Sequence, residues 1–181
     1  MSTYRLEHIF APRSVVLIGG SPRKYSVGGA VLRNLCRAGF GGAIGLVNPH
    51  HRAIEGITAV KTVNDLAGPP DLAVIATPAA IVPGLIAGLG SKGCAAAIVL
   101  TAGLGHGPGS LAEAAERAAR LNGMRIVGPN CLGVLVPGQK LNASFAASAP
   151  RAGDVALISQ SGAIAAGLIE WAATRSVGFS A

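Results

Sequence analysis

A glycine-rich segment near the N-terminus combines residue types that bind phosphate groups. It reads Gly19-Gly20-Ser21-Pro22-Arg23-Lys24-Tyr25-Ser26-Val27-Gly28 and directly follows the short apolar run Ser14–Ile18. A strand that enters a glycine turn and then a helix presents unpaired backbone N–H groups, and the positive end of the helix, to an anion. Arg23 and Lys24 place full charges beside that turn. The spacing departs from G-x-G-x-x-G, so an ordinary strand–helix turn with exposed basic residues is the alternative.

The end of the second expected strand, Ala43–Val47, discriminates between nucleotide ligands. An NAD enzyme places Asp or Glu at this point, where the carboxylate accepts hydrogen bonds from the ribose hydroxyls. This chain instead has Asn48-Pro49-His50-His51-Arg52, which is neutral to basic. Arg52 and one of the histidines suit a phosphate on the ribose, at the 3′ position in CoA or the 2′ position in NADP. The pattern disfavours NAD, and an exposed turn without a ligand is the alternative for the two histidines.

Two later segments have features of functional turns. The first, Gly128-Pro129-Asn130-Cys131-Leu132-Gly133, follows a short strand-like run. Its cysteine has no adjacent base or cation in the sequence, so we expect a packing residue and not a nucleophile. The second, Ser159-Gln160-Ser161-Gly162-Ala163, begins a helix with hydroxyl and N–H groups, which suits either an anion site or a simple serine N-cap.

Apolar runs and helical periodicities alternate along the chain. Strands are expected at 14–18, 43–47, 72–76, 95–100 and 125–127, with a small strand or turn at 57–60. Helices are expected at 27–38, 79–90 and 110–122, and a helical turn is expected to begin at Asp65. Ser26 should cap the first helix and Gly39 should close it, and its apolar stripe should consist of Val27, Val31, Leu32 and Leu35. Ser110 and Glu113 should form a capping box. This alternation predicts an α/β fold, a Rossmann-like doubly wound parallel sheet with right-handed crossovers.

A domain boundary is expected at the turn-rich stretch Pro150–Gly153. Residues 1–150 would form the Rossmann-like domain. Residues 151–181 would supply a strand from Val155 to Ser159 and a helix from Gly162 to Thr174. One strand and one helix cannot bury their own apolar faces. We therefore expect residues 151–181 to begin a second, incomplete α/β domain.

Composition and charge exclude several classes of protein. Half of the residues are apolar and 13% are charged, which allows a sizeable core. No apolar run has the length of a membrane span, and the N-terminus does not resemble a signal peptide, so we expect a cytoplasmic protein. Three widely spaced cysteines predict neither a disulfide framework nor a metal site. Seven of the fifteen Arg and Lys residues, but one acidic residue, lie within positions 1–52. This suits a polyphosphate ligand, and no nucleic-acid-binding motif supports the rival interpretation.

Several segments, read in order, resemble one family: the CoA-binding part of the NDP-forming acyl-CoA synthetases, which includes the succinyl-CoA synthetase α subunit. The resemblance covers almost the whole chain. Its segments are Val15–Gly20, Ser26–Gly28, Leu46–Pro49, Asp71–Pro78, Leu100–Gly103, Gly128–Gly133, Leu141–Phe145 and Ser159–Ala163. The resemblance implies coenzyme A, or an acyl-CoA, bound across the strand ends at the topological switch point of the first domain.

The resemblance also implies roles for particular residues. Those at the CoA phosphates would be Gly19, Gly20, Ser21, Arg23, Lys24, Ser26, Val27 and Gly28. Those bordering the adenosine part would be Asn48, Pro49, His50, His51 and Arg52. Thr77, Pro78, Thr101 and Ala102 would flank the pantetheine, with Asn130 near the thiol. Gly28→Leu is expected to block the phosphates and leave the core intact.

In this family, acyl-CoA and phosphate react to give acyl phosphate and CoA. The phosphoryl group then passes to a histidine, and from this phosphohistidine to a nucleoside diphosphate. Ser161, Gly162 and Ala163 would face that phosphohistidine. The histidine itself and the ATP-grasp region have no counterpart in this sequence, so we expect no catalytic residue here, no activity of these residues alone, and a partner domain or subunit. The chain also departs from the family pattern: His50 and His51 follow Asn-Pro where many relatives have lysine, and Leu104–Gly107 lacks a usual acidic residue.

Three alternatives stay open at the level of the sequence. The chain could be a regulatory CoA-binding region of a protein lysine acetyltransferase, a stand-alone CoA-binding module, or an NADP-binding Rossmann oxidoreductase. For the acyl-CoA synthetase interpretation, the expected partner is a CoA thioester ligand. Neither nucleic acid nor a membrane is an expected partner, and a homodimer is a further expectation.

Overall fold

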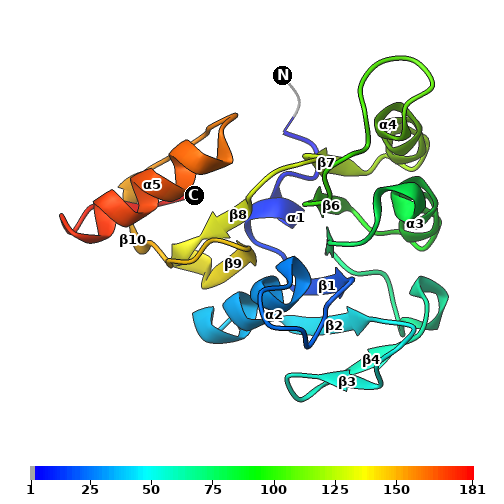
Figure 1. Ribbon diagram of the computed structural model, residues 1–181, viewed down its shortest axis with the longest axis horizontal. Coiled ribbons are helices and arrows are strands. Elements are labelled where there is room, and N and C mark those ends of the chain that lie inside the picture. Colours follow the sequence, from blue (N-terminus) through cyan, green and yellow to red (C-terminus); the bar gives the residue numbers. More distant parts are fainter. Residues whose placement is uncertain (1–2) are drawn as a thin grey trace.

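The computed structural model describes residues 3–181 and is built around a seven-stranded sheet (Figure 1). The strand order is β3-β4-β2-β1-β5-β6-β7. Neighbouring strands are parallel except for the β3–β4 pair. The strands are β1 (Ser14–Ile18), β2 (Ala43–Val47), β3 (Ala53–Ile54), β4 (Ile57–Val60), β5 (Leu72–Ile75), β6 (Ala96–Val99) and β7 (Arg125–Val127). The chain progresses outward in opposite directions from β1, which creates a topological switch point between β1 and β5 and confirms the expected fold class.

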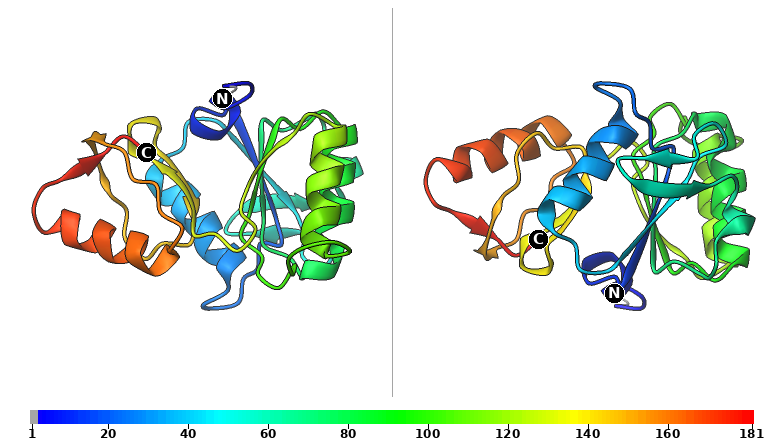
Figure 2. Two further views of the ribbon diagram at one scale, coloured as in Figure 1. Left: turned by 90° about the horizontal axis from the view of Figure 1, so that it is seen from above. Right: turned by 90° about the horizontal axis from the view of Figure 1, so that it is seen from below.

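Helices cover both faces of this sheet (Figure 2). Helix α2 (Val27–Ala38) lies on one face, and α3 (Val82–Ser91) and α4 (Leu111–Leu121) lie together on the other. Short helical segments occur at α1 (Glu7–Phe10), Val63–Asp65 and Ala79–Ile81. Among the described residues, no helix is long and apolar enough to cross a membrane.

Burial on both faces explains why the central strands are continuous apolar runs. In β1, Val15 and Leu17 pack on the α2 side, whereas Val16 and Ile18 pack on the side of α3 and α4. All four are at most 3% exposed. A parallel strand buried on both faces has no polar side to reveal its period of two. The boundaries of β1, β2, β4 and β7 agree with those expected from the sequence.

Helix α2 begins and ends as its sequence indicates. Ser26 accepts a hydrogen bond from the Gly29 N–H at 3.2 Å, and Gly39 closes the helix with a left-handed backbone at φ 72°. The expected apolar stripe is correct for Val31, Leu32 and Leu35, which are buried, but wrong for Val27, which is 43% exposed. The buried residues of this first turn are Gly28 and Gly29, so Val27 lies on its exposed side.

Two helical starts differ in detail from expectation. Ser110 caps α4 by accepting from the Glu113 N–H, but the Glu113 carboxylate accepts from the N–H of Gly109, at 2.7 Å, in place of Ser110. The reciprocal half of the expected capping box is therefore wrong. The helical turn expected to begin at Asp65 ends there instead, because Thr62 and Asp65 cap each other across Val63–Asp65.

A β-hairpin that was not expected from the sequence extends the α2 side of the core. It consists of β8 (Gly133–Val136) and β9 (Leu141–Ser144), joined by a helical turn at Pro137–Gln139. The Asn34 side chain of α2 donates to the carbonyls of Ser144 and Ala146, both at 2.9 Å. These bonds attach the hairpin to the helix. Its strands are short and their burial depends on α2, which a local pattern does not show.

The C-terminal segment forms a small β–α–β unit beside the hairpin (Figure 2). Strand β10 (Arg151–Val155) pairs in parallel with β11 (Gly178–Phe179), and α5 (Gly162–Ala173) connects them. The strand expected from Val155 to Ser159 is therefore misplaced. A Cβ added at Gly153 would lie 2.5 Å from the backbone of Gly178, so glycines at both positions permit the close pairing. Because Gly153 and Gly178 are distant in sequence, the local pattern does not show that they pair. The apolar residues Leu157 and Ile158 instead placed the expected strand too late in the sequence.

Candidate functional site

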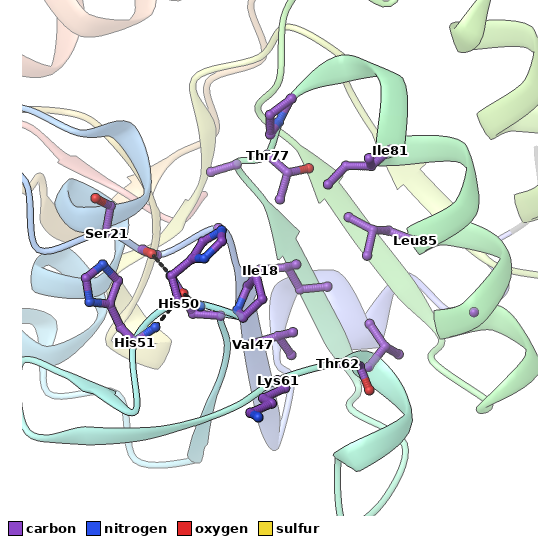
Figure 3. A pocket seen from close by; sticks show the side chains of 18 of the residues that line it. Ile18, Ser21, Val47, His50, His51, Lys61, Thr62, Thr77, Ile81 and Leu85 are labelled. Atoms are coloured by element: carbon purple, nitrogen blue, oxygen red, sulfur yellow. Dashed lines mark hydrogen bonds between the residues drawn. The ribbon is translucent and has the colours of Figure 1, made fainter.

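A cavity of about 750 Å³ opens at the carboxyl ends of β1, β2, β4 and β5 (Figure 3). This is the switch point of the sheet, the place where ligands bind in open α/β folds. The lining residues are Ile18, Gly19, Gly20, Ser21, Arg23, Val47, Asn48, Pro49, His50, His51, Lys61, Thr62, Val63, Asn64, Ala76, Thr77, Pro78, Ile81, Gly84, Leu85 and Gly88.

Close backbone approach explains the glycines at one end of the cavity. Gly19 has φ 90°, and a Cβ there would lie 2.4 Å from the Ala76 carbonyl oxygen. Only glycine combines this conformation with that approach. A Cβ at Gly28 would lie 2.1 Å from the Gly19 carbonyl oxygen. Gly28 thus lets α2 pack on the loop, and the expectation that Gly28→Leu leaves the core intact is wrong.

Asn48 connects the two loops that border the cavity. Its side chain is buried, and its Nδ2 donates to the Gly20 carbonyl at 2.7 Å. Its Oδ1 accepts from the backbone N–H groups of His50, at 2.7 Å, and His51, at 3.0 Å. Figure 3 shows the resulting turn, which places both imidazoles at the cavity. Asn48 therefore sets the positions of both the glycine loop and the histidine turn.

The charges around the cavity favour an anion. Arg23 and Lys61 line it together with His50 and His51, and the lining contains neither Asp nor Glu. Lys61 was not singled out from the sequence, although its position as the first residue after β4 is a usable signal. A cavity lined by one sign of charge attracts ligands of the opposite sign.

The opposite wall is apolar. Ile81 and Leu85 face the cavity from the α3 side, with Ile18 and Val47 at the strand ends (Figure 3). Gly84 and Gly88 also line this wall, and a Cβ added at either would meet no atom within 4 Å. This wall was not expected from the sequence, because the residues of α3 have the pattern of an ordinary buried helix. A cavity with one basic side and one apolar side suits a ligand that combines phosphates with an apolar or aromatic group.

A hydrogen bond between Thr101 and Thr77 connects the loops that follow β6 and β5 near the cavity. The Thr101 hydroxyl donates to the Thr77 carbonyl at 2.8 Å. Within residues 3–181, the Thr77 Oγ1 is the buried side-chain oxygen or nitrogen that has no hydrogen-bond partner. Thr77 lines the cavity, whereas Thr101 lies behind it and supports the loop.

The structure separates the residues singled out from the sequence into two groups. Those that line the cavity are Gly19, Gly20, Ser21, Arg23, Asn48, Pro49, His50, His51, Thr77 and Pro78. Those outside its lining are Lys24, Ser26, Val27, Gly28, Arg52, Thr101, Ala102, Asn130, Ser161, Gly162 and Ala163.

Local interactions account for two residues of the second group, Ser161 and Asn130. The Ser161 hydroxyl caps α5 by accepting from the Ile164 N–H at 3.3 Å. Asn130 has a left-handed backbone, with φ 57°, and donates its N–H to the Thr101 carbonyl at 3.0 Å.

Cys131 lies behind the same strand ends and is half-buried. Its thiol lies 3.4 Å from the Val99 carbonyl oxygen. Burial raises the pKa of this thiol above its ordinary value, so the reactive thiolate is disfavoured at neutral pH. These observations agree with a packing role. The part of the chain that the structure describes contains no group of three or more His, Cys, Asp or Glu side chains arranged to hold a metal ion.

Comparison with known proteins identifies similar sequences. Residues 13–137 match the family described as CoA binding domain. The chain is 39% identical over 178 residues to the ADP-forming acetate–CoA ligase of Methanocaldococcus jannaschii, covering 98% of this chain and 25% of the ligase. It is 36% identical over 178 residues to subunit alpha of ADP-forming acetate–CoA ligase II of Pyrococcus furiosus, covering 97% of this chain and 38% of that subunit.

A solved structure of a similar synthetase resembles this chain along almost its whole length. The dinucleotide forming acetyl-coenzyme A synthetase 1 of Ca. Korarchaeum cryptofilum, in complex with phosphate and ADP, superposes with a TM-score of 0.90 and 35% identity. The match covers 97% of this chain and 38% of that one. The chain thus spans between a quarter and about two fifths of the length of the relatives named here.

Proposed function

The chain belongs to the family of CoA binding domains, and from this premise we propose that coenzyme A or an acyl-CoA binds in the cavity at the ends of β1, β2, β4 and β5. The observation that carries the proposal is the pairing of a basic, acid-free rim with an apolar wall at the switch point. CoA carries phosphates, a purine and a flexible amide chain. The cavity offers a partner for each kind of group.

The arrangement of side chains supports one orientation of the ligand. The pyrophosphate would lie beside Ser21 and Arg23, whose loop closes that side of the cavity. The ribose 3′-phosphate would lie near His50, His51 and Lys61. In this orientation Lys61 takes the part first assigned to Arg52.

The rest of the ligand would follow the strand ends. The pantetheine would pass Thr77 and Pro78 toward Ala102 and Asn130. Ser26, Val27 and Gly28 would support the phosphate loop from behind, whereas Lys24 would lie on its exposed side and add positive charge for the phosphates.

We further propose that the domain serves an ADP-forming acyl-CoA synthetase, which interconverts acyl-CoA, ADP and phosphate with the free acid, CoA and ATP. The relatives named above are ligases of this kind, and they favour this activity over the acetyltransferase and oxidoreductase alternatives. The phosphohistidine and the ATP-grasp region would come from a further domain or subunit. The cytoplasm is the compartment in which this chemistry is expected.

In the same proposal, residues 1–150 form the CoA-binding domain and residues 151–181 begin the next one. Ser161, Gly162 and Ala163, at the start of α5, would face the phosphohistidine. The apolar and exposed side chains of α5 support a further packing partner: Ile164 is 60% exposed and Trp171 is 49% exposed. Such a face gains stability when another domain, another subunit or a second copy of the chain covers it.

Isothermal calorimetry with CoA, dephospho-CoA, NAD and NADP tests the ligand proposal. CoA should bind most tightly, and dephospho-CoA should bind at least about tenfold more weakly, equivalent to about 1.4 kcal/mol, if the basic rim contacts the 3′-phosphate. NAD that bound as tightly as CoA would contradict the proposal. Arg117→Gln on α4, away from the cavity, is the control for a loss of positive charge.

A further inference from the structure

Tyr25, in the loop between β1 and α2, has an unfavourable backbone conformation and little to compensate for it. Its φ is 66°, in the left-handed region that a bulky residue rarely adopts. Its side chain is 85% exposed. The ring contact found for it is with the ammonium of its neighbour Lys24, 5.0 Å from the ring centroid. The ring therefore adds almost no packing, and glycine would fit the position better.

The loop that carries Tyr25 is held at both ends. The Ser26 hydroxyl lies within hydrogen-bond distance of the carbonyls of Ser21, at 3.1 Å, and Arg23, at 2.9 Å. The Arg23 N–H donates to the Ser21 hydroxyl at 3.2 Å. These contacts hold the residues on both sides of Tyr25. The conformation of the loop around Tyr25 is therefore fixed by hydrogen bonds.

This loop borders the cavity. Ser21 and Arg23 line it, and two peptide units place the Tyr25 Cα at most about 7.6 Å from that of Arg23. The other lining residues provide no aromatic side chain apart from the two imidazoles. Tyr25 itself is not among the lining residues. A large exposed ring on a loop that borders a basic cavity, with an unfavourable backbone conformation, points to a role of the side chain in binding.

We propose that Tyr25 is a ligand-positioning residue whose ring packs against the adenine of CoA bound in the cavity. The inference rests on the function proposed above. Aromatic rings stack favourably on bases, and Tyr loses few degrees of freedom when it does so. The Lys24 ammonium over the ring lies on the same loop as Arg23, where it adds positive charge for the phosphates of the same ligand. Tyr25 would thus cover the purine while Arg23 and Lys24 neutralise the phosphates.

The test combines stability and binding measurements on the 181-residue chain. Tyr25→Gly and Tyr25→Asn remove the ring and place at this position residues that tolerate a left-handed backbone. The unliganded variants should unfold at the same or a higher urea concentration than the wild type. Their affinity for CoA and for adenosine 3′,5′-bisphosphate should fall about tenfold. Tyr25→Phe, which keeps the ring, should bind CoA within about twofold of the wild type.

4′-Phosphopantetheine, which lacks the adenine, separates stacking from damage to the loop. Its affinity should be the same for the wild type and for both ring-removing variants. Unchanged CoA affinity in Tyr25→Gly and Tyr25→Asn would overturn the inference and leave the proposed function standing. An equal loss for 4′-phosphopantetheine would also overturn it, because the ring would then act through the loop. A wild-type chain that did not bind CoA would overturn the proposed function as well.

Discussion

At the scale of single residues, Asn48 has the greatest influence on the shape of the site. One amide group donates to the glycine loop and accepts from two N–H groups of the histidine turn. The residue is 7% exposed, so water cannot replace these bonds without a structural change. An acid at this point would be expected in a dinucleotide enzyme that uses NAD. Asparagine supplies the same acceptor for the turn, and in addition a donor for Gly20.

Asn48→Asp tests this account because it changes one donor into an acceptor. The new oxygen would face the Gly20 carbonyl oxygen with no proton between them, and the carboxylate would bring a negative charge into a buried position. The free energy of unfolding should fall by about 3 kcal/mol, since an unpaired buried group costs about 1–3 kcal/mol and a charged one costs more. Urea unfolding at neutral pH measures the change. Asn64→Asp is the matched control: it adds the same charge to the cavity at an exposed residue and should change stability by less than about 0.5 kcal/mol. Equal effects of the two substitutions would contradict the role of Asn48.

At the scale of elements, glycines have two distinct roles at this site. Gly28 belongs to the contact between the first turn of α2 and the loop after β1, where no Cβ fits. Gly84 and Gly88 on α3 have open space beside them and face the cavity. The first kind stabilises the packing of a helix on a loop. The second kind costs helix stability and leaves the volume free for a ligand.

Two alanine substitutions should therefore have opposite effects on stability. Gly28→Ala brings a methyl group against the Gly19 carbonyl and should destabilise the chain by about 1–3 kcal/mol, in the range of overpacking. Gly88→Ala should stabilise it by about 0.5–1 kcal/mol, because alanine loses less backbone entropy in a helix. Thermal and urea unfolding of the two variants, compared with the wild type, measure both signs. A stable Gly28→Ala variant would mean that α2 can shift away from the loop without cost.

At the scale of the whole molecule, the sheet and the C-terminal unit differ in how completely they are buried. Every residue of β5 and β6 is buried, whereas every residue of β10 is exposed. Helix α5 is apolar around most of its circumference, yet Ile169 and Ala172 are its buried residues. A helix of this composition is normally covered on several sides. This contrast supports the proposed division of the chain near residue 150.

The prediction at this scale concerns catalysis. Residues 1–181 alone should form no ATP from acyl-CoA, ADP and phosphate, because a phosphoryl relay needs a nucleophile placed beside its donor. Labelled ATP or acetyl phosphate should leave no acid-labile phosphate on His8, His50, His51 or His106. Mass spectrometry of the four histidine peptides gives the readout, with CoA binding as the control for a folded site. Stoichiometric phosphorylation of His106 would contradict the prediction.

The sequence by itself determined the elements whose signals are local. The apolar run of β1, the Ser26 cap, the Gly39 end of α2 and the strand–helix alternation agree with the structure because each depends on neighbouring residues. The neutral and basic residues after β2 also indicated the class of ligand, since the chemistry at a strand end can be read without knowing what surrounds it. The family resemblance, carried by short motifs in order, was confirmed by the comparison with known proteins.

The tertiary structure decided which side chains meet at the cavity. Lys61 joins the site because β4 and β5 end at the same edge of the sheet. The apolar wall joins it for the same reason, and it consists of Ile81, just before α3, and of Leu85 and the two glycines within α3. The β8–β9 hairpin and the β10–β11 pair likewise depend on partners far along the chain. Gly28 was interpreted as an open approach for an anion, but the loop after β1 occupies the space beside it. Such contacts join residues that are distant in sequence, so no local periodicity reveals them.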